Sequence, residues 1–211
     1  MNPALLVIAG PNGAGKTTVT ERLRRDSWSE GVEYLNPDEV ARDRFGDWNS
    51  PDASRRAAEW CEHRREALLA AGAGIAFESV FSQPDKVAFV QRACAAGYFV
   101  RVFFVSTSSP RINASRVARR VMRGGHTVPI EKIVSRYARS MSNLSRVIPS
   151  AQRVYVFDNS VEDQDARLCV RVTEGRIRKV YGALPFWVQD AIAGVPWHDT
   201  AEDLRGGEAG R

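Results

Sequence analysis

The chain has 211 residues, enough for one α/β domain or for one domain with a small appendage. Its apolar fraction of 44% is that of a globular protein, and no apolar stretch approaches the roughly 20 residues that a membrane span requires. The net charge of +5 is unevenly distributed along the chain. Residues 111–146 contain eight Arg, one Lys, one Glu and no Asp, a charge of +8, so the rest of the chain carries about −3. A basic block in a mildly acidic chain indicates a local site for a polyanion such as a nucleotide triphosphate.

The N-terminal apolar residues are not preceded by a basic segment, so we expect no signal peptide and a cytoplasmic protein. The three cysteines, Cys61, Cys94 and Cys169, are far apart and odd in number, which is typical of unpaired thiols in a reducing compartment. The histidines are scattered along the chain, and we expect no structural metal site.

The first predicted elements surround a glycine-rich loop. Leu5–Ala9 predicts a buried parallel strand, and a helix is predicted after the loop. Between them, Gly10–Thr17 reads GPNGAGKT and matches G-x-x-x-x-G-K-T, the phosphate-binding P-loop or Walker A motif. Lys16 would reach the β- and γ-phosphates and the Thr17 hydroxyl would ligate Mg²⁺, so the motif predicts binding of ATP with Mg²⁺. The residues expected to bind the nucleotide are Gly10, Pro11, Asn12, Gly13, Ala14, Gly15, Lys16, Thr17 and Thr18.

A carboxylate follows the second predicted strand, residues 31–35. Asn36 is a helix N-cap and Pro37 occupies the first helical position, which places Asp38 at the carboxyl end of the strand. In doubly wound sheets, ligands bind at this edge. Asp38 is therefore a candidate for the acceptor site, although an acid in a first helical turn also complements the helix dipole.

The next predicted helix, residues 51–71, begins with Ser50 as N-cap. Ile75–Phe77 then predicts a buried strand that ends at Glu78 and Ser79. A carboxylate in this position can hold Mg²⁺ through water or bind a substrate hydroxyl, and it can also cap a neighbouring helix. We expect Glu78 and Ser79 to bind the substrate.

A helix at 84–96 and a strongly apolar strand at 98–105 precede two helices rich in arginine, which together span about 110–148. Their candidate nucleotide-binding arginines are Arg116, Arg120, Arg123 and Arg136. A run of charge usually marks a solvated face. Here almost no acids are available to pair at i,i+4, and unpaired like charges destabilise a helix. We therefore favour an arginine-rich lid that closes on phosphates.

The C-terminal part predicts one more strand at 153–157, followed by Asn159 as a further nucleotide-binding candidate. Residues 168–172 and 176–181 predict a β-hairpin with glycine in the left-handed position. A short helix at about 185–193 and a glycine-rich tail at 205–211, which we expect to fray, complete the chain. We expect a kinase-like domain over residues 1–165, with the hairpin and helix of residues 166–211 packed on it.

The alternation of strands and helices predicts an α/β fold, with the parallel sheet of a P-loop NTPase or kinase. A kinase needs a carboxylate near the γ-phosphate and an arginine lid, and Asp38, Glu78 and the arginine block supply them. The alternative is a nucleotide-dependent binding module or an ATPase that acts on nucleic acid. Against it, Tyr137 is the only aromatic residue in 111–146, whereas single-strand binding relies on aromatic stacking.

Several motifs together resemble the zeta toxin family, in its small single-domain branch, over residues 4 to about 160. They are GPNGAGKTT at 10–18, NPDEVA at 36–41, FES at 77–79 and the stretch 113–137, which contains GGHTVP at 124–129. The last motif is the most specific, because P-loops occur in many families. The resemblance implies a P-loop kinase fold, and its better-known members phosphorylate the amino-sugar hydroxyl of UDP-N-acetylglucosamine.

The resemblance also implies roles for individual residues. Lys16 and Thr17 match the positions that bind phosphate and Mg²⁺, Asp38 matches the base that acts on the acceptor hydroxyl, and Glu78 matches an acid near the substrate. Where the family often has Glu-Thr-Thr, this chain has Glu-Ser-Val at 78–80, so one hydroxyl is missing beside the acceptor.

The arginine block fits the same resemblance. Arg120 and Arg136 match the lid arginines that bind nucleotide phosphates, and Arg116 and Arg123 are further candidates. The partners implied are a small-molecule acceptor with a hydroxyl group and an antitoxin protein, with no membrane and no nucleic acid.

Overall fold

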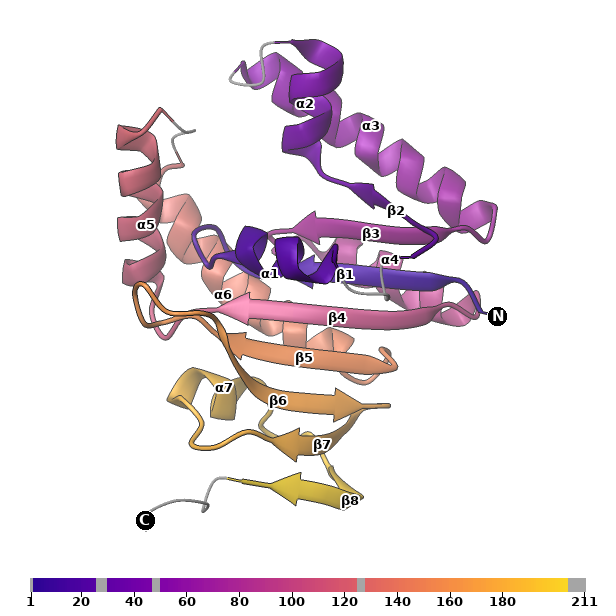
Figure 1. Cartoon of the computed structure of the whole chain (residues 1–211), viewed down its shortest axis with the longest axis vertical. Helices are drawn as coiled ribbons and strands as arrows, with labels where there is room; N and C mark the ends of the chain where they lie inside the picture. The colour runs from indigo at the N-terminus through magenta and orange to yellow at the C-terminus, as the bar shows by residue number, and fades with distance from the viewer. Residues whose placement is uncertain (1, 26–29, 47–49, 125–127, 205–211) are drawn as a thin grey trace.

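The computed structural model describes residues 2–25, 30–46, 50–124 and 128–204. Its strands form one sheet in the order β2-β3-β1-β4-β5-β6-β7-β8 (Figure 1). The first five strands in this order are parallel, β6 and β7 each run antiparallel to the strand before them, and β8 is parallel to β7. The strands are β1 Ala4–Ala9, β2 Val32–Leu35, β3 Gly74–Ser79, β4 Phe99–Ser106, β5 Arg153–Asp158, β6 Arg167–Thr173, β7 Arg176–Val180 and β8 Trp197–Asp203.

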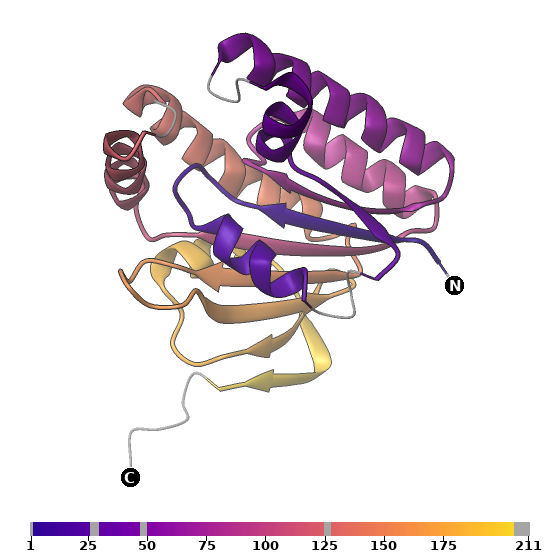
Figure 2. The same cartoon turned by 45° about the horizontal axis from the view of Figure 1, so that its top comes forward.

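Helices cover the two faces of the sheet unequally. Helix α1 packs on one face, and α3, α4, α6 and α7 pack on the other (Figure 2). Helices α2 and α5 stand beyond the carboxyl ends of the parallel strands (Figure 1). The helices are α1 Lys16–Leu23, α2 Pro37–Phe45, α3 Pro51–Ala70, α4 Pro84–Ala95, α5 Pro110–Met122, α6 Ile130–Val147 and α7 Phe186–Ala191.

The core follows from the alternation of side chains along β1. Leu5 and Val7 are fully buried against the face that carries four helices. Leu6 points to the opposite face, where it packs with Val19 of α1 and Phe103 of β4. A parallel strand that is buried on both faces reads as a continuous apolar run, which is why Leu5–Ala9 is apolar throughout.

The predicted helix starts are confirmed. The Asn36 side chain accepts a hydrogen bond from the backbone N–H of Asp38 at 2.9 Å, and the Ser50 hydroxyl accepts from Ala53 N–H at 3.1 Å. Each cap is followed by a proline in the first turn. These caps fix where the chain turns from strand or loop into helix, and the first of them sets the position of Asp38.

The C-terminal hairpin is confirmed, and it extends the central sheet. Gly175 has a φ of 71°, and Glu174 before it has a φ of 49°, as a tight two-residue turn requires. The short helix α7 docks through Trp187, whose indole N–H donates to the Asp158 carboxylate at 2.8 Å. Strand β8 was not predicted, because WHDTAED lacks the alternating apolar residues that indicate a strand.

Some expectations concern residues outside the described part of the chain. Gly125, His126 and Thr127 of the GGHTVP motif and the tail 205–211 belong to this group. All three cysteines are free thiols. No helix among the described residues is long and apolar enough to cross a membrane.

Candidate active site

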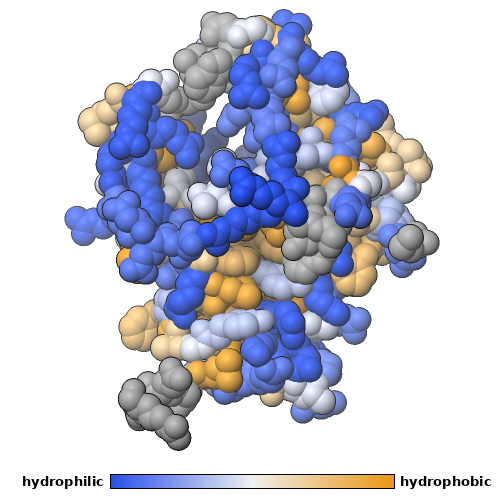
Figure 3. Space-filling view, in the orientation of Figure 1, coloured by the Kyte–Doolittle hydropathy of each residue, from blue (hydrophilic) through white to orange (hydrophobic). Residues whose placement is uncertain are grey.

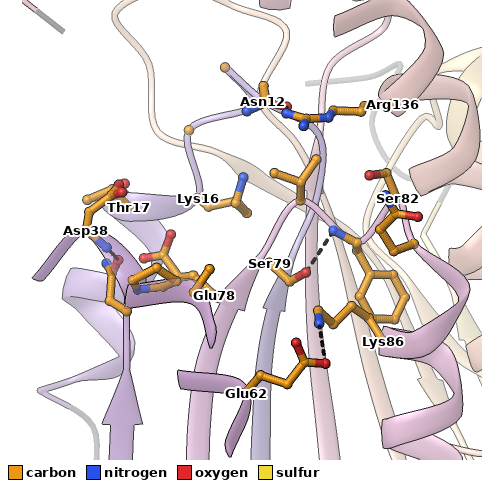
Figure 4. Close-up of a pocket in the computed structure, with 18 of the residues that line it drawn as sticks. Asn12, Lys16, Thr17, Asp38, Glu62, Glu78, Ser79, Ser82, Lys86 and Arg136 are labelled. Atoms are coloured by element: carbon orange, nitrogen blue, oxygen red, sulfur yellow. Dashed lines mark hydrogen bonds and ion pairs between the residues drawn. The ribbon is translucent and has the colours of Figure 1, made fainter. Parts of the chain in front are cut away.

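A cavity of about 500 Å³ opens at the carboxyl ends of β1, β2 and β3. Figure 4 shows Asn12 and Arg136 at one end of it, Glu62 and Lys86 at the other, and Lys16 and Glu78 between them. The predicted site residues that line it are Asn12, Gly13, Gly15, Lys16, Thr17, Asp38, Glu78, Ser79, Arg120 and Arg136. The P-loop, both predicted carboxylates and two of the predicted arginines therefore meet in one cavity.

The P-loop requires glycine at two positions, because of its backbone conformation and because of close neighbours. Gly13 and Gly15 have φ values of 76° and 88°, in the left-handed region that favours glycine. A Cβ at Gly13 would lie 2.6 Å from the backbone oxygen of Asn113, and a Cβ at Gly15 would lie 2.2 Å from the side-chain nitrogen of Asn159. Helix α1 starts directly after this loop without a side-chain cap, so its first N–H groups are available to an anion.

Lys16 is held in the loop by its own backbone. Its ammonium group donates to the carbonyls of Gly10 at 2.9 Å and Pro11 at 3.2 Å. Burial lowers the pKa of Lys16 to about 8, an effect that Glu78 and Asp38 oppose and Arg120 reinforces. A bound phosphate would give this ammonium group a negatively charged partner, which the two carbonyl groups do not provide.

Glu78 is fixed by two hydroxyl groups. Thr20 of α1 donates to its Oε1 at 2.6 Å, and Tyr34 of β2 donates to the same atom at 2.9 Å. Asn36 in turn donates to the Tyr34 oxygen at 3.2 Å, while its own oxygen holds the N–H of Asp38. Burial, and then the charge of Glu78, raise the pKa of Tyr34. A chain of hydrogen bonds therefore connects the two carboxylate positions.

Thr17 and Asp38 are exposed at the mouth of the cavity, where a nucleotide and an acceptor could enter. The donor set fits Mg²⁺, which prefers a few protein oxygens, such as hydroxyl and carboxylate groups, together with substrate phosphates. Thr17, Asp38 and Glu78 supply such oxygens around one cavity.

Both arginine-rich helices reach the P-loop through Asn12. Arg136 of α6 donates to the Asn12 side-chain oxygen at 3.3 Å, and the buried Asn113 of α5 donates to its backbone oxygen at 2.6 Å. Thr107, at the end of β4, donates to the Asn113 side chain. Arg136 therefore contacts the loop that would hold the phosphates, and Arg120 lines the same cavity.

The other arginines of the block are not all uncompensated, contrary to the expectation from local sequence. Arg116 donates to the backbone oxygens of Asn159 at 2.8 Å and Val161 at 3.3 Å, and Arg119 forms an ion pair with Glu162. The acid comes from the loop between β5 and β6, far away in sequence, so i,i+4 spacing could not reveal it. Arg123 is exposed at the end of α5, away from the cavity.

Asn159 contacts the P-loop itself. Its side chain donates to the carbonyl of Ala14 at 2.8 Å, and its backbone N–H donates to Ser106 of β4. The predicted nucleotide-binding residues that do not line the cavity are Gly10, Pro11, Ala14, Thr18, Arg116, Arg123 and Asn159.

Sequence reasoning missed the wall of the cavity beyond Glu78. The further lining residues include Glu62, Arg65, Ser82, Gln83 and Lys86, from α3 and the start of α4. Glu62 and Arg65 are one helical turn apart, so a polar stripe on α3 was the available signal. Figure 3 shows that the surface over α1, α2 and α5 is mostly hydrophilic and is hollowed between α2 and α5.

Fold and cavity together define a P-loop kinase-like protein, with a parallel sheet, a phosphate-binding loop after β1 and two arginine-rich helices beside it. A family model described as "Zeta toxin" matches residues 1–166. The chain therefore belongs to the zeta toxin family. A search of curated proteins finds no match.

Solved structures share the fold at low sequence identity. A chain of the AvrRxo1-ORF1:AvrRxo1-ORF2 complex with sulphate ions has a TM-score of 0.65 and 17% identity, covering 100% of this chain and 66% of that chain. The same complex with ATP gives a TM-score of 0.64 and 16% identity, with coverage of 100% and 66%. A chain of the PezAT toxin-antitoxin system of Streptococcus pneumoniae gives 0.58 and 14%, with 94% and 81% covered. This chain thus spans 60–66% of the AvrRxo1 complex chains that it matches, and the likeness concerns the fold.

Proposed function

We propose that the protein is an ATP-dependent phosphotransferase that moves the γ-phosphate of ATP to a hydroxyl group of a small molecule. The observation that carries this proposal is the meeting of Lys16, Asp38, Glu78 and two arginines in one cavity. The family supports a UDP-amino sugar or another nucleotide as the acceptor.

The roles follow from the positions of the side chains. Lys16 and the N–H groups of the P-loop hold the β- and γ-phosphate oxygens, and Asp38 takes the proton from the attacking hydroxyl. Arg120 and Arg136 neutralise the charge that spreads over the transferred phosphoryl group. Mg²⁺, held by Thr17 together with the phosphates, would neutralise further charge on the β- and γ-oxygens.

Glu78 positions the acceptor in this mechanism. Two hydroxyls bind one of its oxygens, Oε1, and Glu78 lies between the P-loop lysine and the acceptor end of the cavity. Ser79 follows it in the wall, where its hydroxyl oxygen accepts from the N–H of Phe81 at 2.9 Å. The acceptor hydroxyl would enter between these groups and Asp38.

The test is incubation with ATP·Mg²⁺ and a panel of hydroxyl acceptors that includes UDP-N-acetylglucosamine, other UDP sugars and nucleosides. Mass spectrometry should find one acceptor that gains a phosphate while ADP forms in equal amount. Hydrolysis of ATP at the same rate with and without every acceptor would contradict the proposal and would favour an ATPase.

An antitoxin is the partner that family membership supports, because similar solved structures include toxin-antitoxin complexes. Such a partner would act most simply by covering the open mouth of the cavity at Thr17 and Asp38. Loss of ATP binding in the complex would be the expected sign.

A further inference from the structure

Arg65 is a buried arginine on α3 that the proposed mechanism does not use. Its side chain lines the cavity and only 6% of the residue is exposed. The guanidinium lies beside two aromatic rings that pack against each other: its carbon is 5.0 Å from the Phe77 centroid and 5.7 Å from the Phe89 centroid, and the two centroids are 5.8 Å apart. Cation–π contacts with both rings help to hold the guanidinium at this wall of the cavity.

No hydrogen bond or ion pair joins this guanidinium to another residue in the described part of the chain, and its Nε is buried without a partner. The acids around it are engaged elsewhere. Glu66 pairs with Arg92 at 2.5 Å, and Lys86 pairs with Asp85 at 2.6 Å and with Glu62 at 3.8 Å. Desolvation lowers the pKa of Arg65, and the charges of Glu62, Asp85 and Glu66 oppose this shift without forming a hydrogen bond or ion pair to the guanidinium. A buried charge without a partner costs stability, so a bound anion would remove a cost that the folded chain carries.

The wall beside Arg65 is built to keep its shape. Phe81 adopts a φ of 59°, which is strained for a bulky residue. Helix α6 holds this segment, because Asn143 donates to the backbone oxygens of Phe81 at 2.9 Å and Gln83 at 3.3 Å. Helix α4 begins at the same place without a side-chain cap, and its N-cap residue, Gln83, lines the cavity.

We infer that Arg65 binds an anionic group of the acceptor, a phosphate or a carboxylate, at the end of the cavity where Glu62 and Lys86 lie. The inference rests on the proposed function and narrows it. The acceptor is an acidic hydroxyl compound, and a neutral sugar or polyol is a poor substrate. Arg65 is then the residue that selects for acceptor charge, while the P-loop selects for ATP.

The test is a calorimetric titration of inorganic phosphate, and separately of acetate, into protein whose P-loop is filled with a non-hydrolysable ATP analogue and Mg²⁺. Wild-type protein should bind at least one of the two anions, and which one it binds identifies the anionic group. Arg65→Met should weaken that binding by about tenfold or more, because a charged hydrogen-bond partner is lost. It should leave the affinity for the analogue within about twofold.

Arg56→Met is the matched control. Arg56 lies on the same helix as Arg65 and also contacts an aromatic ring, that of Phe45, at 4.4 Å, but it is exposed and does not line the cavity. This variant has the same change of charge and should bind the anion like wild type.

Thermal unfolding of the free proteins separates binding from a structural role. Arg65→Met should raise the melting temperature, because an unpaired buried charge is replaced by an apolar side chain that still packs against the rings. A lower melting temperature with unchanged anion binding would overturn the inference, as would the absence of anion binding in wild-type protein that holds the analogue. Failure of wild-type protein to bind the analogue would contradict the proposed function and, with it, this inference.

Discussion

At the scale of single residues, the position of Lys16 predicts that nucleotide binding depends on pH. Burial lowers its pKa to about 8 in the free protein, and phosphate charges would raise it again on binding. Binding therefore takes up a proton when the pH exceeds about 8, and the affinity for ATP should fall by up to about tenfold per pH unit above that value. Below about pH 7 the lysine is already charged and should contribute no pH dependence.

Titration of ATP between about pH 7 and 9.5 measures this dependence. A Lys16→Met variant should bind ATP more weakly than wild type, and its affinity for ATP should not show the additional decrease above pH 8. Constant affinity of the wild-type protein up to pH 9.5 would mean that the ammonium of Lys16 is not the group that binds phosphate.

Tyr34 controls the position of Glu78. Tyr34→Phe removes a hydrogen bond to Glu78 and leaves the amide group of Asn36 without its acceptor. We expect a loss of about 1–2 kcal/mol in the free energy of unfolding and a several-fold decrease in kcat, because Thr20 alone then orients the carboxylate. Urea unfolding and steady-state kinetics measure the two effects, and a variant with wild-type kcat would show that Glu78 needs no such support.

At the scale of elements, α6 holds the loop between β3 and α4, which forms the wall of the cavity where we propose that the acceptor binds. Asn143→Ala removes both side-chain hydrogen bonds to that loop, so two backbone oxygens lose their donors. We expect the free energy of unfolding to fall by about 1–3 kcal/mol. We also expect the KM for the acceptor to increase more, relative to wild type, than the KM for ATP.

Ser142→Ala is the control for this prediction, because Ser142 lies next to Asn143 on α6 but is exposed. It should behave like wild type in urea unfolding and in both KM values. Equal increases of the two KM values in Asn143→Ala would indicate a general loosening of the fold instead of an effect on the acceptor wall.

Sequence reasoning predicted the elements whose signals are local. The Gly10–Thr17 loop follows an apolar strand, Asn36 and Ser50 stand before prolines, and Gly175 provides a turn, so each feature can be identified within a few residues. Strand β8 could not be found in this way, because its residues lack an alternating apolar pattern and it is defined by its hydrogen-bonded pairing with β7.

At the scale of the whole molecule, the cavity brings together residues that lie as far apart in the sequence as Asn12 and Arg136. Sequence motifs named the P-loop, Asp38 and Glu78, and the family resemblance put Arg120 and Arg136 ahead of the other arginines; all of these reach one cavity. Local sequence could not show what the remaining arginines of the block contact. Those contacts depend on residues far away in the sequence: Glu162 pairs with Arg119, and Asn12 accepts from Arg136. The role proposed for Arg65 could not be read from the sequence either, because the burial of its side chain and the unpartnered Nε appear only in the folded chain.

The central claim is that one cavity binds ATP through the P-loop and activates an acceptor hydroxyl through Asp38. Asp38→Asn tests it most directly, because the substitution keeps the size of an exposed side chain and removes the base. Using the acceptor found in the panel, we expect kcat to fall by about a hundredfold or more while the dissociation constant for ATP stays within about twofold. Turnover within a few-fold of wild type, with ATP still bound, would contradict the claim.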